Sequence, residues 1–170
     1  MRRNNLVALG IHAIIIVYAF SAYAISWSSS LDGRVALAIF FAVVALITVA
    51  GYILLGYVFL MPLPRKNLLS VSLPAVILIL VVVAECAFHV LIIGTFTNQM
   101  FISDLLNFGM IFGFAAVTSI FTPSVGLGDT GVIERVITFF VVAPLPSLFM
   151  YLGLRLKMYG QSRASKAAST

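Results

Sequence analysis

Five long apolar stretches constrain this chain more than any other feature. They cover residues 6–25, 35–61, 68–93, 105–121 and 136–154. A helix needs about 20 predominantly apolar residues to cross the roughly 30 Å hydrocarbon core of a bilayer. Inside lipid, a single segment satisfies its own backbone hydrogen bonds only as an α-helix. We therefore predict an all-α fold: a polytopic integral membrane helical bundle of five apolar segments, four or five of them spanning, with one broken or re-entrant segment if only four span.

The composition leaves room for one membrane domain and little else. Of the 170 residues, 62% are apolar and 9% are charged, whereas a soluble domain has about 45–50% apolar and about 25% charged residues. We assign residues 1–160 to a single transmembrane domain and residues 161–170 to a polar, basic tail that we expect to fray. The lipid bilayer is the partner that this composition predicts. The net charge of +5 is better explained by basic anchors facing anionic lipid than by nucleic-acid binding.

The positions of the ten basic residues bear on orientation. If all five segments span and the N-terminus is cytoplasmic, five basic residues lie on each side of the membrane. If the fourth segment does not span, eight lie inside and two outside; if the fifth does not span, nine lie inside and one outside. Cytoplasmic loops carry the excess of Lys and Arg. We therefore predict a plasma (inner) membrane protein with a cytoplasmic N-terminus and leave the side of the C-terminus open.

The fifth segment carries Pro144 and Pro146 near its centre. Proline lacks an amide hydrogen and its ring clashes with the preceding turn of a helix, so this pair predicts a break or a kink. Backbone groups freed at such a break can coordinate a substrate in transporters.

Glu85 and His89 lie inside the third segment, one turn apart and on one face. Ionisable side chains at this depth are costly and usually face a cavity, a partner or the bundle interior. We predict that they bind a small molecule or an ion; a hydrogen bond between the two that only satisfies them in the packed bundle is the alternative. His12, in the first segment, lies on the opposite side of the bilayer from His89 and is predicted to be a hydrogen-bonded packing residue.

The chain offers little for metal or covalent chemistry. It contains two histidines and one cysteine, fewer than a typical zinc site uses. It also lacks the GxSxG and HExxH signatures of hydrolases. We predict no metal site and no cofactor, and we assign no catalytic residue.

Gly109 and Gly113 form a GxxxG motif, and Ala116 extends the same face by one turn. Small residues at this spacing allow two helices to approach closely in lipid. Packing within the chain is the first interpretation. The second is an interface with a partner membrane subunit or with a second copy of the chain.

Three functions are compatible with these features. The first is a small membrane transporter, or the membrane-embedded substrate-binding component of one, with its site near Glu85 and His89 and opposite the broken fifth segment. The second is a non-catalytic assembly, regulatory or immunity-type subunit of a larger membrane complex, bound through Gly109, Gly113 and Ala116. The third is an intramembrane enzyme with Glu85 and His89 as acid and base, which the missing nucleophile disfavours. We prefer the first.

Overall fold

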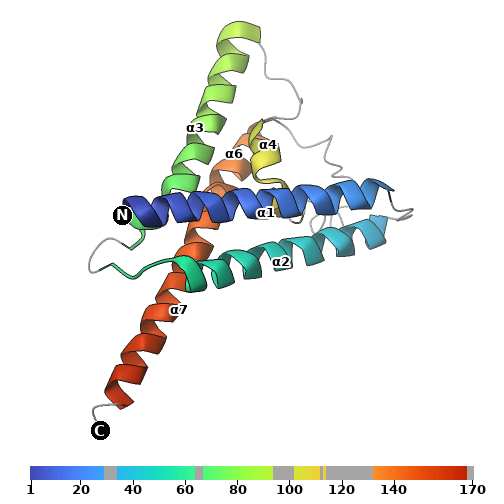
Figure 1. The fold of residues 1–170 in the computed structure, drawn as a ribbon. Helices are drawn as coiled ribbons and strands as arrows, with labels where there is room; N and C mark the ends of the chain where they lie inside the picture. The colour runs from blue at the N-terminus through green and yellow to red at the C-terminus, as the bar shows by residue number, and fades with distance from the viewer. Residues whose placement is uncertain (29–33, 64–66, 94–101, 112, 114–131, 168–170) are drawn as a thin grey trace.

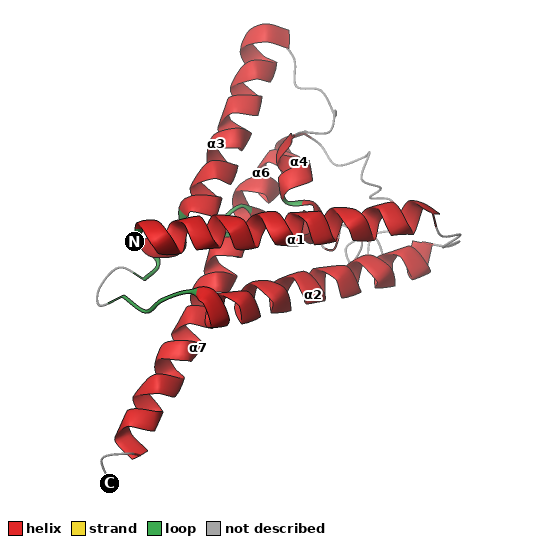
Figure 2. Ribbon diagram, viewed as in Figure 1, coloured by secondary structure: helices red, strands yellow, loops and turns green. Residues whose placement is uncertain are grey.

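The computed structural model describes residues 1–28, 34–63, 67–93, 102–111, 113 and 132–167. Regular structure in these residues is helical, as Figure 2 shows. Helix α1 spans Arg2–Ser28 and α2 spans Arg34–Phe59. A 3₁₀ turn, η1 (Leu69–Val71), precedes α3 (Leu73–Phe88), which continues into a π-helical turn, η2 (His89–Ile93). The other helices are α4 (Ile102–Leu106), α6 (Val132–Val142) and α7 (Leu145–Ala167).

Four helical stretches of the described chain are long and apolar enough to cross a membrane. They are Arg2–Ser26, Val35–Phe59, Leu73–Ile92 and Val136–Ser165. Their outer faces carry large apolar side chains, such as Leu54 with 62% of its surface exposed. Such exposure is unfavourable in water and ordinary in lipid. The all-α class is confirmed, and the helices indicate an integral membrane protein.

The predicted segment 105–121 is not one of these four stretches. Helix α4 ends at Leu106, Asn107 forms a turn, and a further helical turn begins at Phe108. The side-chain amide of Asn107 donates a hydrogen bond to the carbonyl oxygen of Ser103 at 3.3 Å. Asparagine side chains that bond to nearby backbone compete with helix formation. Residues 112 and 114–121 lie outside the described residues, so five spans are not established.

Helices α1 and α2 form an antiparallel hairpin, and α3 and α7 run across it at a steep angle (Figure 1). Helix α7 packs mainly against α2, while α3 contacts α1, α6 and α7. The two glycines at the α2–α7 crossing make this contact close. A Cβ at Gly56 would lie 2.5 Å from the carbonyl oxygen of Met150, and a Cβ at Gly153 would lie 2.8 Å from the amide nitrogen of Tyr57. Neither glycine belongs to a GxxxG motif, so the sequence carries no signal for this contact.

Two asparagines bind the start of α1 to the connection between α2 and α3. Asn4 donates to the carbonyl oxygen of Met61 at 2.7 Å and to the hydroxyl of Ser70 at 3.2 Å, and it accepts from the Met61 amide at 3.1 Å. Asn5 donates to the carbonyl oxygen of Leu69 at 3.3 Å. These bonds place the N-terminus of α1 beside the end of α2 and the beginning of α3.

Helix α3 begins later than the apolar segment that contains it, because its first turn is fixed by side chains from other helices. The amide of Leu73 donates to the side-chain oxygen of Asn5 at 3.2 Å, and the amide of Ala75 donates to the hydroxyl of Ser147 at 3.3 Å. Pro74 has no amide hydrogen to satisfy. The first-turn donors of a helix have no partner within it, so these contacts define where α3 starts.

The fifth apolar segment is divided at the prolines. Helix α6 ends at Val142 and α7 begins at Leu145. Pro144 lies in the break, while Pro146 lies in the first turn of α7, where a missing amide hydrogen costs nothing. Helix α7 then continues to Ala167, so residues 161–167 are helical where fraying was expected. The Arg, Gln, Ala and Lys residues of this tail are good helix formers.

Candidate functional site

The carboxylate of Glu85 is bound to the start of α4. One oxygen accepts hydrogen bonds from the amides of Ile102 and Ser103, the latter at 3.3 Å, and the other accepts from the Ser103 hydroxyl at 2.8 Å. The first amides of a helix have no partner within it, and a negative charge at that end is favourable. Glu85 therefore holds α4 against α3, and both of its oxygens already have partners in the protein.

His89 lies at the point where α3 becomes the π-helical turn. Its amide bonds to the carbonyl oxygens of Glu85 and Cys86. Its side chain is 8% exposed, and its ring meets that of Phe88 edge-on at 6.0 Å between centroids. The structure thus places Glu85 against α4 and buries His89 at the end of α3. Neither residue lines the large cavity described below.

Gly109 and Gly113 face other helices of the same chain. A Cβ at Gly109 would lie 2.8 Å from the Cβ of Ala19 on α1, and a Cβ at Gly113 would collide with the Cβ of Ala45 on α2. The glycines therefore make room for the α1–α2 hairpin. Ala116, the third residue predicted for this face, lies outside the described residues.

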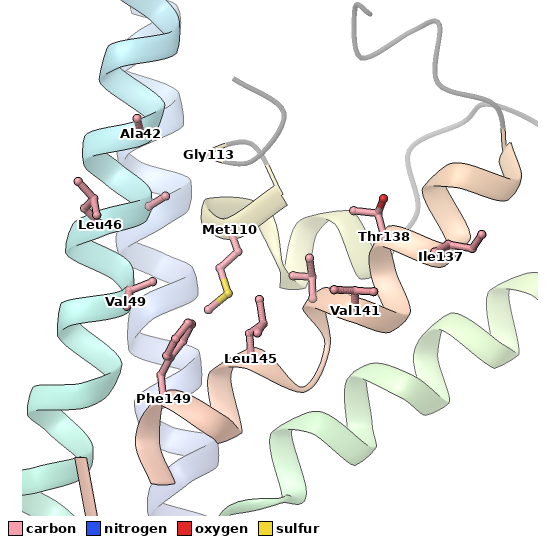
Figure 3. Close-up of a pocket in the computed structure, with 12 residues that line it drawn as sticks. Ala42, Leu46, Val49, Met110, Gly113, Ile137, Thr138, Val141, Leu145 and Phe149 are labelled. Atoms are coloured by element: carbon pink, nitrogen blue, oxygen red, sulfur yellow. The ribbon is translucent and has the colours of Figure 1, made fainter. Parts of the chain in front are cut away.

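An apolar cavity of about 590 Å³ lies between α2, the 108–113 region and the α6–α7 break (Figure 3). We call it the apolar cavity. Among its lining residues, Thr138 alone carries a side-chain oxygen. Figure 3 shows Val49, Met110, Leu145 and Phe149, from three parts of the chain, bordering this space. Leu46 also lines it but is 68% exposed, so the cavity is open on that side.

The apolar cavity lies beside the middle of α2 and the start of α7. Its wall on α2 is formed by residues 42–49, which are central in Arg34–Phe59. Its opposite wall includes Val142 and Leu145, the residues on either side of the helix break. The broken helix thus borders a cavity, but α2 lies opposite it rather than the predicted site of Glu85 and His89.

His12 and Tyr52 form a buried polar pair between α1 and α2. Nδ1 of His12 and the hydroxyl oxygen of Tyr52 are 2.5 Å apart, and the rings stack with centroids 5.8 Å apart. His12 is thus a hydrogen-bonded packing residue, as predicted. Thr48 lies one turn before Tyr52 on α2, and both line a second, much smaller cavity together with His12 and Asn107. We call it the polar cavity.

Thr48, Tyr52 and Asn107 were not predicted as site residues from the sequence. The spacing of Thr48 and Tyr52, four residues apart within an apolar segment, is a usable signal because such residues share one face of a helix. Their partner His12 on another helix could not be inferred from spacing. No group of three or more His, Cys, Asp or Glu side chains is placed to hold a metal ion within the described chain.

Comparison of the chain with protein-family models, with curated proteins and with solved structures finds no match.

Proposed function

We propose that this chain is a small membrane transporter, or the membrane-embedded substrate-binding component of one, and that it binds the acyl chain of a lipid-like molecule. The observation that carries the proposal is the apolar cavity of about 590 Å³ beside the break between α6 and α7. Ligand pockets of about 300–1,000 Å³ are typical of small-molecule sites.

The chemistry of the lining side chains indicates which class of ligand the apolar cavity can bind. Leu46, Val49 and Val141 offer no group that could replace the hydration of an ion or a sugar, and burying an unpaired polar group is costly. An acyl chain has no polar groups, so it loses no hydrogen bonds when it enters the apolar cavity. Because the cavity lies beside the middle of α2, acyl chains of the surrounding bilayer are the molecules with direct access to it.

The helix break supports movement of the ligand. Val142 and Leu145 line the cavity from the two sides of Pro144. Discontinuous helices border substrate sites in many transporters and change angle during transport. A change in the angle between α6 and α7 would alter the width of the cavity.

The subunit alternative receives less support from these contacts. Its proposed interface was the face of Gly109 and Gly113, and both glycines lie against α1 or α2 of the same chain. The enzyme alternative required Glu85 as an acid or base, and that carboxylate binds the backbone of α4.

We further propose that the protein lies in the plasma membrane with both termini in the cytoplasm. Nζ of Lys157 on α7 donates to the carbonyl oxygens of Val58 and Leu60 at 3.1 and 3.0 Å. These carbonyls lie at the end of α2, and Asn4 binds the neighbouring Met61. The contacts favour one membrane side for the N-terminus and the basic part of α7.

Photo-cross-linking with a phospholipid that carries a diazirine in its acyl chain tests binding. We expect the wild type to be labelled at cavity residues and Val49→Trp, which places an indole ring in the cavity, to lose most of this labelling. Leu54→Trp is the matched control, since Leu54 lies on the same helix, is 62% exposed and does not line the cavity. Equal labelling of all three proteins, spread over exposed surfaces, would show ordinary lipid contact and contradict the proposal.

Transport is tested separately in liposomes. A fluorescent lipid in the inner leaflet is protected from a membrane-impermeant quencher until it crosses. We expect the purified wild type to accelerate crossing several-fold and Val49→Trp to abolish this acceleration, with Leu54→Trp unchanged. Site-specific binding without acceleration would identify the chain as a binding component that needs another subunit.

A further inference from the structure

Three residues that line the polar cavity each carry a buried polar side-chain atom without a hydrogen-bond partner in the described chain. These atoms are Nε2 of His12, Oγ1 of Thr48 and Oδ1 of Asn107. The three side chains are 5%, 2% and 4% exposed. They come from α1, from α2 and from the turn after α4, and they line one cavity of about 10 Å³.

Three unpaired polar atoms around one space point to a polar ligand. A buried polar atom without a partner loses its hydration and gains nothing in return. Native proteins satisfy such groups with internal water, which typically makes about three hydrogen bonds, and a cavity of roughly 10–15 Å³ is needed for one molecule. The cavity has this size and offers this number of partners.

We infer that the polar cavity binds one water molecule, held by His12, Thr48 and Asn107. The water donates to Oδ1, the side-chain amide oxygen, of Asn107. Its bonds to the Thr48 hydroxyl and to Nε2 of His12 run in either direction, because a hydroxyl donates or accepts and the imidazole adopts the matching tautomer. A metal ion is a poorer occupant, since it requires four or more ligands and a compensating charge.

The water completes a polar connection across the helices. Glu85 on α3 accepts from Ser103, and the carbonyl oxygen of Ser103 accepts from the side chain of Asn107 at 3.3 Å. Beyond the water, His12 bonds to Tyr52. The connection links α3, α4, α1 and α2 and is independent of whether the apolar cavity binds an acyl chain.

Nuclear magnetic resonance of the wild type in nanodiscs tests the water directly. The carbon-bound ring protons that flank Nε2 of His12, assigned by comparison with His89→Gln, should show magnetisation transfer from a long-lived water molecule. The measurement does not depend on the tautomer of His12. Absence of this transfer overturns the inference.

The variant Thr48→Val gives an independent test. A polar cavity with a bound water and one without it predict different changes in Tm. With a bound water, the variant removes one of its three partners, and we expect Tm to fall by roughly 2–6 °C. Without one, the variant replaces an unpaired buried hydroxyl by a methyl group of the same shape, so Tm would stay or rise and overturn the inference. Ser21→Ala removes an exposed hydroxyl from α1 and serves as the control, with little expected change.

Discussion

Several polar side chains of the membrane helices pair with backbone groups that helix ends leave unsatisfied. Glu85 accepts from the first amides of α4, and Lys157 donates to carbonyl oxygens at the end of α2. Ser147 accepts from the first turn of α3. In lipid there is no water to replace such partners, so each unpaired group is costly. A charged residue in a span can thus be required for folding without binding a ligand.

Glu85→Ala tests this role at the scale of one residue. Because the variant leaves the amides of Ile102 and Ser103 unpaired, we expect the free energy of unfolding to fall by about 1–3 kcal/mol. Glu85→Gln should cost less, since its amide oxygen still accepts. Detergent-titration unfolding measures the free energy, and hydrogen exchange should rise at residues 102–106. The control is Val83→Ala at an exposed position of the same helix; equal effects of Glu85→Ala and this control would contradict the capping role.

At the scale of elements, spacing along the chain predicted what one helix does by itself. Helix α1 contains the predicted segment 6–25, α2 covers the predicted segment 35–61 except its last two residues, and the proline pair marks the end of α6. The start of α3 was not predictable from its own residues, because Asn5 and Ser147 fix it from other helices. The apolar cavity was missed for the same reason, since it arises from where α2 and α7 cross.

The crossing of α2 and α7 yields a prediction with a built-in control. Gly153→Ala places a methyl group against the backbone of α2, and we expect a loss of about 1–3 kcal/mol in the free energy of unfolding. A Cβ at Gly160, on the same helix, meets nothing within 4 Å. Gly160→Ala should therefore stabilise by up to about 1 kcal/mol through helix propensity. Detergent-titration unfolding measures the change in the free energy of unfolding for both variants. Changes of the same sign would mean that α2 and α7 do not cross at Gly153.

We predict that α6 and α7 join into one continuous helix only when both Pro144 and Pro146 are replaced. With Pro144→Ala alone, Pro146 would stand inside a continuous helix and clash with the preceding turn. With Pro144→Ala and Pro146→Ala together, we expect one helix, in which the Cα atoms of residues 137 and 152 lie about 22 Å apart. Spin labels at these exposed positions in a Cys86→Ser background measure the distance by electron resonance. A pair at Leu148 and Tyr159, both on α7, should not change.

The orientation of the whole molecule in the membrane depends on the number of spans, which hydropathy alone left undecided. Four described stretches are long and apolar enough to span. With four spans and a cytoplasmic N-terminus, eight basic residues lie inside, namely Arg2, Arg3, Arg65, Lys66, Arg155, Lys157, Arg163 and Lys166; the other two, Arg34 and Arg135, lie outside. This is the distribution that the positive-inside tendency favours. The contact of Lys157 with the end of α2 agrees with it and comes from three-dimensional structure, which charge counting does not use.

Cysteine accessibility in intact cells decides between four and five spans. In a Cys86→Ser background, Ser28→Cys lies at the end of α1 and Ser162→Cys lies on the basic part of α7. A membrane-impermeant maleimide should label Ser28→Cys in intact cells and Ser162→Cys only after the membrane is opened, because an even number of spans returns the chain to its starting side. Labelling of both in intact cells would mean that the region 105–121 crosses the membrane. Labelling of Ser162→Cys alone would keep four spans and reverse the orientation, which would contradict the charge argument but not the fold.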